Sequence, residues 1–517
     1  MIDIIKKIVK SVFVFLFIIV ISFKVVCSQD NEIDYSKDTI VINIHYAKIN
    51  FDNSLPMNYT SLQILNQISE TLVNYDIKNG FIPNLAESWQ VSPDNKEWVF
   101  KLRKVKFQDE TFLDSACVKM NFERIISANK RFKGWGYAFL NPLFFLDKID
   151  IPDRQTVKFI FKKPYPNLLR ILSMPQFVIL SKNSLSDENV YLNHPSGCGP
   201  FRFIESRIAE RVVLERFDDY YGKKSFVRRI VFELIQDEDL RILSLKKEMS
   251  DIAVVSDLFY IEQKQKLNNE ENIMLNCNKM NIDLFFNTHS YPFNELRFRK
   301  AFADMINVNR FYFYGLNVKE PSENKKNIDI YNEKNKDFIK IINSSMKKNT
   351  EIKILIQKFN DLNIPSSEKI CEGLSKILNF FKIKYKIIVL DDNVIEKQLR
   401  KGNYNIVIYG TSENTLLKDC FYYLNLSQYM VYDGIYNKSF YRNDKVGRIL
   451  SDDLTVNMQD NEIESSQLRD ILSQGMPFFN IYKIKLNIIY KKHIKCLNVN
   501  SFGIIDMKKI LLFVSGE

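Results

Sequence analysis

The segment Pro195–Tyr221 has the sequence PSGCGPFRFIESRIAERVVLERFDDYY, and it gives the most direct indication of the fold of this chain. The segment opens on a tight turn, Gly197-Cys198-Gly199-Pro200, and continues in two runs of alternating apolar and polar residues joined by a short polar stretch. Alternation of this kind, bounded by glycine and proline, predicts a strand, a loop and a second strand. At the turn, glycine permits backbone angles that a side chain would forbid, and proline fixes the exit.

The same turn begins like a glycine-rich phosphate-binding loop of the form Gly-x-Gly-x-x-Gly. Arg202 stands in place of its third glycine, and the residues that follow have the pattern of a strand. A phosphate site of that type needs a helix N-terminus next to the loop, where backbone N–H groups face the anion. The turn is therefore interpreted as a structural element that leads into a sheet.

Composition indicates a large globular protein. The chain has 517 residues, of which 46% are hydrophobic and 13% aromatic, so two or three domains with a sizeable core are expected. Its formal net charge of +11 comes from scattered lysines rather than from a stripe of arginine and aromatic residues. Since nucleic-acid binding is associated with a clustered basic surface, we expect no nucleic-acid partner.

The N-terminus has the pattern of an export signal. Three lysines in the first ten residues precede the apolar run Ser11–Phe23, and Lys24 ends it. The run is shorter than the ~20 apolar residues that span a bilayer, and its order of charged and apolar parts is typical of a secretory signal peptide. Residues 1–28 are therefore predicted to be a signal peptide cleaved after Cys27 or Ser28, which implies a periplasmic location. Lipid anchoring at Cys27 and an uncleaved anchor are the alternatives.

The sequence offers no recognisable catalytic or metal-binding motif. Its four histidines lie far apart, and no His-Glu-x-x-His, Gly-x-Ser-x-Gly or P-loop pattern occurs. We therefore expect no enzymatic activity, no cofactor and no metal. The seven cysteines include no Cys-x-x-Cys pair, and the six beyond the N-terminal segment are expected to be small buried thiols, with disulfide pairing as the alternative.

From Glu351 onward, strand and helix patterns alternate. The predicted elements are strand Ile352–Gln357, a helix from Pro365, strand Lys382–Leu390, helix Asp391–Arg400 and strand Asn405–Tyr409. This βαβαβ order implies a parallel sheet with right-handed crossovers, in which binding crevices lie beyond the carboxyl ends of the strands. The loop Gly410-Thr411-Ser412-Glu413-Asn414 follows such an end and is the first candidate for a ligand site.

Three further segments bear on how the domains are joined. Asp283–Asn287 is predicted to be a short strand that leads into an amphipathic helix. The segment Glu320–Thr350 is polar, rich in lysine and asparagine and without a clear period, and it is predicted to be a loop or an excursion at the edge of a lobe. Phe478–Tyr490 is predicted to be a strand-rich segment that crosses between domains.

Seven groups of short motifs, taken in order, resemble one family. They are Pro83–Trp89 with Phe100–Arg103, Phe107–Glu110, Phe112 with Val118 and Arg124, Gly197–Phe201, Asp219–Tyr221, Leu245 with Asp251–Ala253, and Asn287-Thr288 with Pro292-Phe293 and Arg297–Ala301. Each motif is weak alone, and their shared order carries the resemblance. The chain resembles the extracellular solute-binding proteins of peptide-type ABC importers, which include the oligopeptide- and dipeptide-binding proteins.

The resemblance implies an α/β, two-lobed, periplasmic-binding-protein-like (type II) fold with an extra subdomain in the first lobe. It assigns residues 29–284 to the first lobe, with the inserted subdomain at about 76–180, residues 285–484 to the second lobe, and residues 485–517 to a return to the first lobe. It further implies that a small peptide or similar solute binds in a cleft between the lobes of a monomer. The closed form would then dock on an ABC permease in the membrane.

The resemblance also suggests which residues contact the ligand: Gly410, Thr411, Ser412, Glu413, Asn414 and Cys198. Cys198 stands where the family has the threonine of Gly-Thr-Gly-Pro-Tyr. Peptide binders of the family carry an aspartate in the second-lobe loop that pairs with the terminal amine of the ligand, and Glu413 or Asn414 stands at that place here. A glutamate neutralises an ammonium, whereas an asparagine only hydrogen-bonds it.

Several departures from the family pattern keep other functions open. Glu110 replaces the glycine of the family's Phe-x-Asp-Gly turn, and Cys117 replaces an aspartate. One alternative is a binder of haem, a nickel chelate or a sugar. The other is a surface or periplasmic interaction protein that has kept the fold and lost transport.

Overall fold

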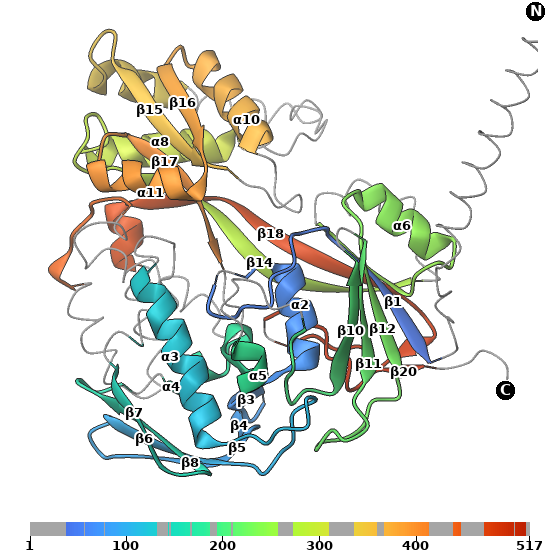
Figure 1. Cartoon of the computed structure of the whole chain (residues 1–517). Coiled ribbons are helices and arrows are strands. Elements are labelled where there is room, and N and C mark those ends of the chain that lie inside the picture. The colour runs from blue at the N-terminus through green and yellow to red at the C-terminus, as the bar shows by residue number, and fades with distance from the viewer. Residues whose placement is uncertain are drawn as a thin grey trace, which may run out of the picture.

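The computed structural model of the chain describes residues 38–512, apart from positions 56, 77, 132–142, 144–145, 166–167, 187–193, 208–209, 257–271, 310–335, 359–366, 413–437, 446–469 and 501. These residues form a two-lobed α/β molecule around one ten-stranded sheet, with a four-stranded sheet beside it (Figure 1). Across this described part of the chain, every helix falls short of the length and hydropathy that a membrane-spanning segment needs.

The ten-stranded sheet runs through both lobes. Its strands, in spatial order, are β10 (Phe201–Arg207), β11 (Arg211–Arg216), β12 (Arg229–Leu234), β1 (Thr39–Ile44), β13 (Ile252–Ser256), β18 (Phe478–Lys491), β14 (Asn272–Phe286), β17 (Ile406–Ser412), β15 (Glu351–Gln357) and β16 (Lys384–Leu390). The first five belong to the first lobe and the last three to the second, and the long strands β14 and β18 pass between them.

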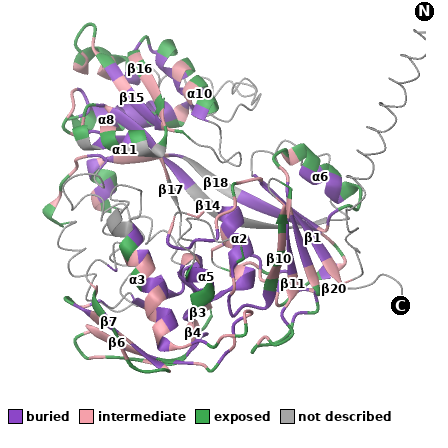
Figure 2. Ribbon diagram, viewed as in Figure 1, coloured by how far each residue is buried: buried purple, intermediate pink, exposed green. Residues whose placement is uncertain are grey.

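The first lobe is built on parallel strands covered by helices on both faces. β1 pairs in parallel with β12 over its whole length and with β13 near its carboxyl end. Helix α2 (Tyr59–Ile68) packs on the face that carries Ile40 and Ile42, and α6 (Glu238–Lys246) covers the other face. Figure 2 shows the resulting pattern, with buried residues along β1 and α2 and exposed residues on the outer side of α6. Strands covered on both sides are buried throughout, which explains their apolar sequences.

The turn at residues 197–200 leads the chain into this sheet, as predicted, but its glycines serve another purpose. Neither Gly197 nor Gly199 is among the described residues with positive φ. A Cβ at Gly199 would instead lie 2.5 Å from the carbonyl carbon of Ile68, and a Cβ at Gly197 would collide with the carbonyl oxygen of Ile68. The Gly199 N–H also donates to that oxygen at 2.8 Å. The glycines therefore allow the turn to approach the end of α2, where a side chain would collide with backbone.

A separate antiparallel sheet forms a subdomain against the first lobe. Its order is β5 (Ala86–Val91), β6 (Glu97–Leu102), β8 (Thr156–Phe161) and β7 (Leu146–Asp153), and α3 (Ser115–Arg131) packs on one face. The rings of Phe100 and Phe122 both meet Phe159 edge to face, with centroids 5.7 and 5.1 Å apart. The unit lies within the segment predicted to be inserted. Short elements join it to the lobe: β2 (Glu70–Thr71), β3 (Val73–Asp76), β4 (Gly80–Pro83), α4 (Leu168–Leu172), β9 (Val178–Ile179) and α5 (Lys182–Leu185).

The second lobe confirms the predicted βαβαβ arrangement, because β15 pairs in parallel with both β16 and β17. Helices α8 (Leu296–Val308) and α10 (Ser367–Phe380) cover one face, and α11 (Asp392–Lys401) covers the other. The prediction of a loop throughout Glu320–Thr350 was wrong for residues 336–345, which are helical. Phe338, Ile341 and Ile342 pack against the lobe core from this helix, at a helical spacing that the surrounding polar residues concealed.

β14 and β18 are antiparallel and carry the chain between the lobes. They pair from Asn272 opposite Lys491 to Phe285 opposite Phe478, with register shifts at Asn278/Met280 and Ile282/Asp283. The prediction of a strand at Phe478–Tyr490 is confirmed. The strand predicted at Asp283–Asn287 begins much earlier, at Asn272, because β18 pairs with the preceding residues as well.

Candidate functional site

Strands of both lobes end at the crossing strands. In the first lobe, β13 ends at Ser256, which pairs with Leu486 of β18. In the second lobe, β17 ends at Ser412, which pairs with Met280 of β14, and Met280 in turn pairs with Ile484 of β18. The two carboxyl ends are thus about three strand spacings (~14 Å) apart across the sheet and about 7 Å apart along it. Since ligands of open α/β sheets bind beyond the carboxyl ends of the strands, this point is the candidate site.

The first-lobe end is fixed by a largely buried ion pair. Glu238 accepts hydrogen bonds from the Ser256 N–H at 2.6 Å and from the Ser256 hydroxyl at 2.8 Å. Arg241, which is fully buried, donates from Nη2 to Glu238 Oε1 at 2.9 Å and from Nη1 to the Ile235 carbonyl at 3.0 Å. The carboxyl end of β13 is therefore occupied by side chains of the protein itself.

The second-lobe end contains three of the residues predicted to contact a ligand. The Gly410 N–H donates to Gln357 Oε1 at 2.9 Å, which ties the ends of β17 and β15 together. Thr411 and Ser412 complete β17, opposite residues 280–281 of β14. The other two predicted residues of this loop lie outside the described part of the chain: Glu413 and Asn414. Gly410, Thr411 and Ser412 thus lie where the two lobes meet.

Two polar residues of β14 beside this end were missed by the sequence analysis. Asn281 and Asp283 are both fully buried. Asp283 Oδ1 accepts a hydrogen bond from Asn480 Nδ2 at 2.9 Å. Tyr409, the residue opposite Asp283 in the ladder, has the ammonium of Lys438 4.3 Å from its ring centroid. A strand buried on both faces is normally apolar, so these polar positions are the signal that could have identified the pair.

Cys198 lies in the apolar core of the subdomain and is 1% exposed. Burial raises the pKa of its thiol well above the ordinary value, so the thiol stays neutral. This placement corrects the expectation that Cys198 faces a ligand, because the turn directs the side chain inward. Among the described cysteines, four are free thiols: Cys117 and Cys198 are buried as expected, whereas Cys371 is half-buried and Cys496 is exposed. Among the described residues, no group of three His, Cys, Asp or Glu side chains has the arrangement of a metal site.

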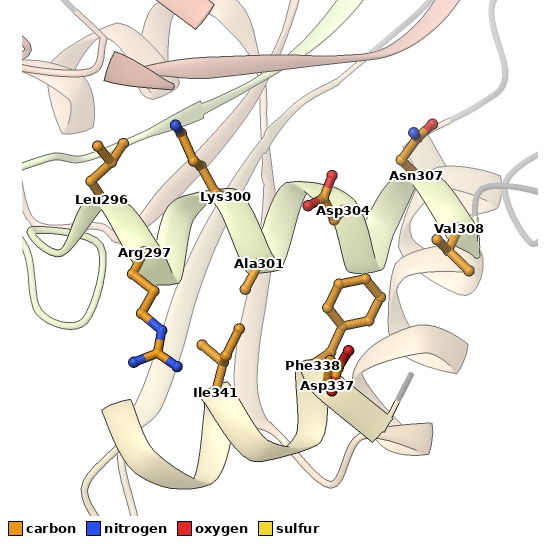
Figure 3. A pocket seen from close by; sticks show the side chains of 10 residues that line it. All are labelled: Leu296, Arg297, Lys300, Ala301, Asp304, Asn307, Val308, Asp337, Phe338 and Ile341. Atoms are coloured by element: carbon orange, nitrogen blue, oxygen red, sulfur yellow. The ribbon is translucent and has the colours of Figure 1, made fainter. Parts of the chain in front are cut away.

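A second concave surface lies on the second lobe. A groove of about 630 Å³ runs between α8 and the helix of residues 336–345 (Figure 3). Ala301 and Phe338 are buried at its floor, whereas Arg297 and Asp304 are exposed at its edges. Its lining comes from these two helices and includes none of the strand ends described above.

Two α/β lobes joined by crossing strands, with strands of both lobes ending at the junction, define the class of type II periplasmic binding proteins. A sequence profile of the bacterial extracellular solute-binding proteins, family 5 (middle region), matches residues 80–432. The chain therefore belongs to this family, as its motifs indicated.

Relatives with assigned names are similar to most of this chain. It is 26% identical over 432 residues to the probable D,D-dipeptide-binding periplasmic protein DdpA of Escherichia coli K12, which covers 80% of this chain and 81% of the relative. It is 20% identical over 522 residues to the dipeptide-binding protein DppE of Bacillus subtilis 168, which covers 93% of each chain.

Solved structures share the fold. HbpA2 from Haemophilus parasuis matches with a TM-score of 0.72 at 19% identity, covering 92% of this chain and 100% of that one. DppA from Helicobacter pylori, in complex with the peptide STSA, matches with a TM-score of 0.70 at 21% identity, covering 92% and 98%. NikA from Brucella suis, in complex with Fe(III)-EDTA, matches with a TM-score of 0.69 at 18% identity, covering 92% and 100%. One fold therefore accommodates both a peptide and a metal chelate.

Proposed function

We propose that this chain is the solute-binding component of an ABC importer and captures a peptide, or a similar small solute, between its lobes. The observation that carries the proposal is the approach of β13 and β17 to each other across β18 and β14. Their carboxyl ends are about 16 Å apart, which an extended chain of about five residues spans at roughly 3.3 Å per residue. Backbone groups at the end of β17 suit the main-chain hydrogen bonds that hold an extended peptide.

The residues that we assign to solute contact are Gly410, Thr411, Ser412, Glu413 and Asn414. The first three offer backbone groups at the end of β17, and one of the last two meets the terminal amine of a peptide. Solute favours closing of the lobes to the extent that it binds the closed form more tightly than the open one. The closed form docks on a membrane permease. Residues 1–28 act as the signal peptide, and the exported protein works in the periplasm as a monomer without enzymatic activity.

A ligand screen tests the proposal. The purified chain is examined by thermal shift and calorimetry with peptides of two to eight residues, alongside haem, nickel chelates and sugars. A ligand present at 100 times its dissociation constant stabilises the native state by about 2.7 kcal/mol, which gives a clear rise in melting temperature. No shift with any peptide would refute the peptide assignment. A shift with another solute would identify that solute, instead of a peptide, as the ligand. No shift with any solute would favour an interaction protein that has kept the fold and lost transport.

Matched variants test the contact to the terminal amine. Glu413→Gln should weaken binding of a peptide with a free N-terminus roughly tenfold, because it removes the charge that neutralises the ammonium. Binding of the N-acetylated peptide should not change. Asn414→Leu is the control, and a loss confined to this variant would assign the amine contact to Asn414 instead.

A further inference from the structure

Two asparagines on the crossing strands are fully buried and unpaired. Asn281 of β14 and Asn487 of β18 are each 0% exposed. Neither Oδ1 nor Nδ2 of either side chain has a hydrogen-bond partner among the residues that the structure describes. Leaving a buried polar group without a partner costs about 1–3 kcal/mol, so a fold that keeps two such amides needs an explanation.

The two asparagines occupy equivalent positions in the two lobes. Asn281 lies opposite Thr411, the second-last residue of β17, and Asn487 lies opposite Val255, the second-last residue of β13. Asn281 also pairs with position 483 of β18, four residues before Asn487. Strand alternation therefore places both asparagines on one face, about 13 Å apart along β18. Each is one residue inside a strand end at which a ligand is expected.

In the first lobe, the protein itself covers Asn487. Val255, its cross-strand neighbour, and Ile489, two residues further along β18, pack against Ile242 and Leu245 of α6. The adjacent strand end is occupied by the ion pair described above. Asn487 therefore lies beneath a helix of its own lobe.

Asn281 lies at the bend between the lobes. The β14–β18 ladder shifts register on either side of it, at Asn278/Met280 and at Ile282/Asp283. Register shifts bend strands, and Asn281 lies between two of them on the strands that join the lobes, so opening or closing of the lobes would change the surroundings of Asn281. Its neighbour on β17, Thr411, also belongs to the segment Gly410–Asn414 to which we assign solute contact.

Building on the proposed function, we infer that Asn281 is a specificity-determining contact for the bound solute and that it takes an amide group. The side chain of asparagine offers an acceptor oxygen and two donor hydrogens. In an extended peptide the N–H and C=O of one residue point to the same side, and a carboxamide likewise presents a donor beside an acceptor, so either satisfies both unpaired atoms of Asn281 at once. A carboxylate only accepts, and an ammonium only donates. Asn281 thus favours a solute with a peptide bond or carboxamide over one with charged groups alone.

The experiment compares Asn281→Leu with Asn487→Leu. Leucine has a similar branched shape but no polar atom, so each variant removes one buried unpaired amide. The probe is the peptide of two to eight residues that raises the wild-type melting temperature most, together with its analogues in which one amide N–H at a time is replaced by an ester oxygen. We expect Asn281→Leu to bind this peptide roughly tenfold or more weakly, equivalent to about 1.4 kcal/mol, and Asn487→Leu to bind it as the wild type does. One ester analogue should lose affinity for the wild type but not for Asn281→Leu.

Each outcome decides the inference. An Asn281→Leu variant that binds the peptide within about twofold of the wild type, or ester analogues that lose equal affinity for both proteins, would overturn it. Ligand-free stability gives a second measure, because both variants should melt at or above the wild-type temperature once the unpaired amide is gone. A large drop for Asn281→Leu alone would show that Asn281 serves the fold. If the wild type binds no peptide, the peptide assignment of the proposed function fails; if the wild type and Asn281→Leu bind the peptide equally, only the Asn281 contact fails.

Discussion

The turn between the subdomain and the first lobe gives a quantitative test of how close approach holds the fold. In Gly199→Ala, the added Cβ would lie 2.5 Å from the carbonyl carbon of Ile68, 2.6 Å from its oxygen and 2.7 Å from the carbonyl oxygen of Gln67. Non-bonded carbon atoms rest about 3.5–4.0 Å apart, so each contact is too close by about 1 Å. All three contacts are with backbone atoms at the end of α2, so no side chain can rotate to relieve them.

The expected loss follows from two contributions. Overpacking of a well-packed site costs about 1–3 kcal/mol, and the upper part of that range applies where backbone has to move. Displacing the turn also weakens the hydrogen bond from the Gly199 N–H to the Ile68 carbonyl, now 2.8 Å long, which is worth about 1 kcal/mol. Gly199→Ala should therefore lower the free energy of unfolding by about 3–4 kcal/mol.

Guanidinium unfolding followed by tryptophan fluorescence measures this loss, since Trp89 and Trp98 lie in the adjoining subdomain. Gly80→Ala is the control. Gly80 has a φ of +72° and nothing within 4 Å of an added Cβ, so alanine there meets only left-handed backbone strain of about 1–2 kcal/mol. Unfolding of Gly199→Ala at the wild-type midpoint, or a smaller loss than in Gly80→Ala, would refute the argument that steric approach requires this glycine.

Three further perturbations test the buried polar and ionisable groups. Burial raises the pKa of Cys117 to about 12, so iodoacetamide at pH 8 should label exposed Cys496 and reach Cys117 only after unfolding, as mass spectrometry of the peptides would show. Glu70→Gln should lower stability by about 1–3 kcal/mol in thermal denaturation, because the carboxylate binds two tyrosine hydroxyls and Lys508 Nζ. Burial lowers the pKa of Lys508, but the nearby Glu70 carboxylate raises it, and the net result is a raised pKa in the folded state. The stability that this pair gives the wild type is therefore fully present below the unfolded pKa of about 10.4 and is lost as the pH rises through the folded pKa. Stability of Glu70→Gln should fall less than that of the wild type over the same rise in pH. Arg241→Met should cost about 3 kcal/mol or more in urea unfolding, because it leaves a largely buried carboxylate unpaired.

The sheet of the second lobe was predictable because each of its elements carries its own period. The strand at Glu351–Gln357 is a run of β-branched and apolar residues, and the helix at Ser367–Phe380 repeats apolar residues at helical spacing. With these elements in alternation, the strands are expected to be parallel, so their carboxyl ends meet at one edge of the sheet. The position of Gly410–Ser412 at that edge therefore follows from local patterns alone.

β14 shows where local patterns fail. Residues 272–281 contain four asparagines and a lysine, which have low strand propensity. They form a strand because β18, about 200 residues later in the chain, supplies a ladder along their whole length. The roles of Asn281 and Cys198 have the same kind of cause. The surroundings of Asn281 depend on which distant strands flank it, and those of Cys198 depend on how a turn packs against α2. Neither can be predicted from the residues next to it in the sequence.

The register of the crossing strands fixes where the site lies, whereas individual side chains fix which chemical groups the site presents. The position of the site is therefore less sensitive to substitutions than its ligand specificity is. Main-chain hydrogen bonds along β14 and β18 place the strand ends at Ser256 and Ser412, and these bonds survive the replacement of side chains. Single side chains decide what is presented there. Glu238 occupies the first-lobe end, whereas the amide of Asn281 has no partner among the described residues on the second-lobe side.

Selection among solutes should therefore reside on the second-lobe side. Glu238→Ala should lower the free energy of unfolding by about 1–3 kcal/mol, because it leaves Ser256 and the buried Arg241 without their partner. It should leave unchanged the ratio of affinities for a peptide and its ester analogue. Asn281→Leu should shift that ratio without loss of stability. The two quantities are measured in parallel by urea unfolding and by calorimetry, and an equal shift of the affinity ratio in both variants would contradict this division between the lobes.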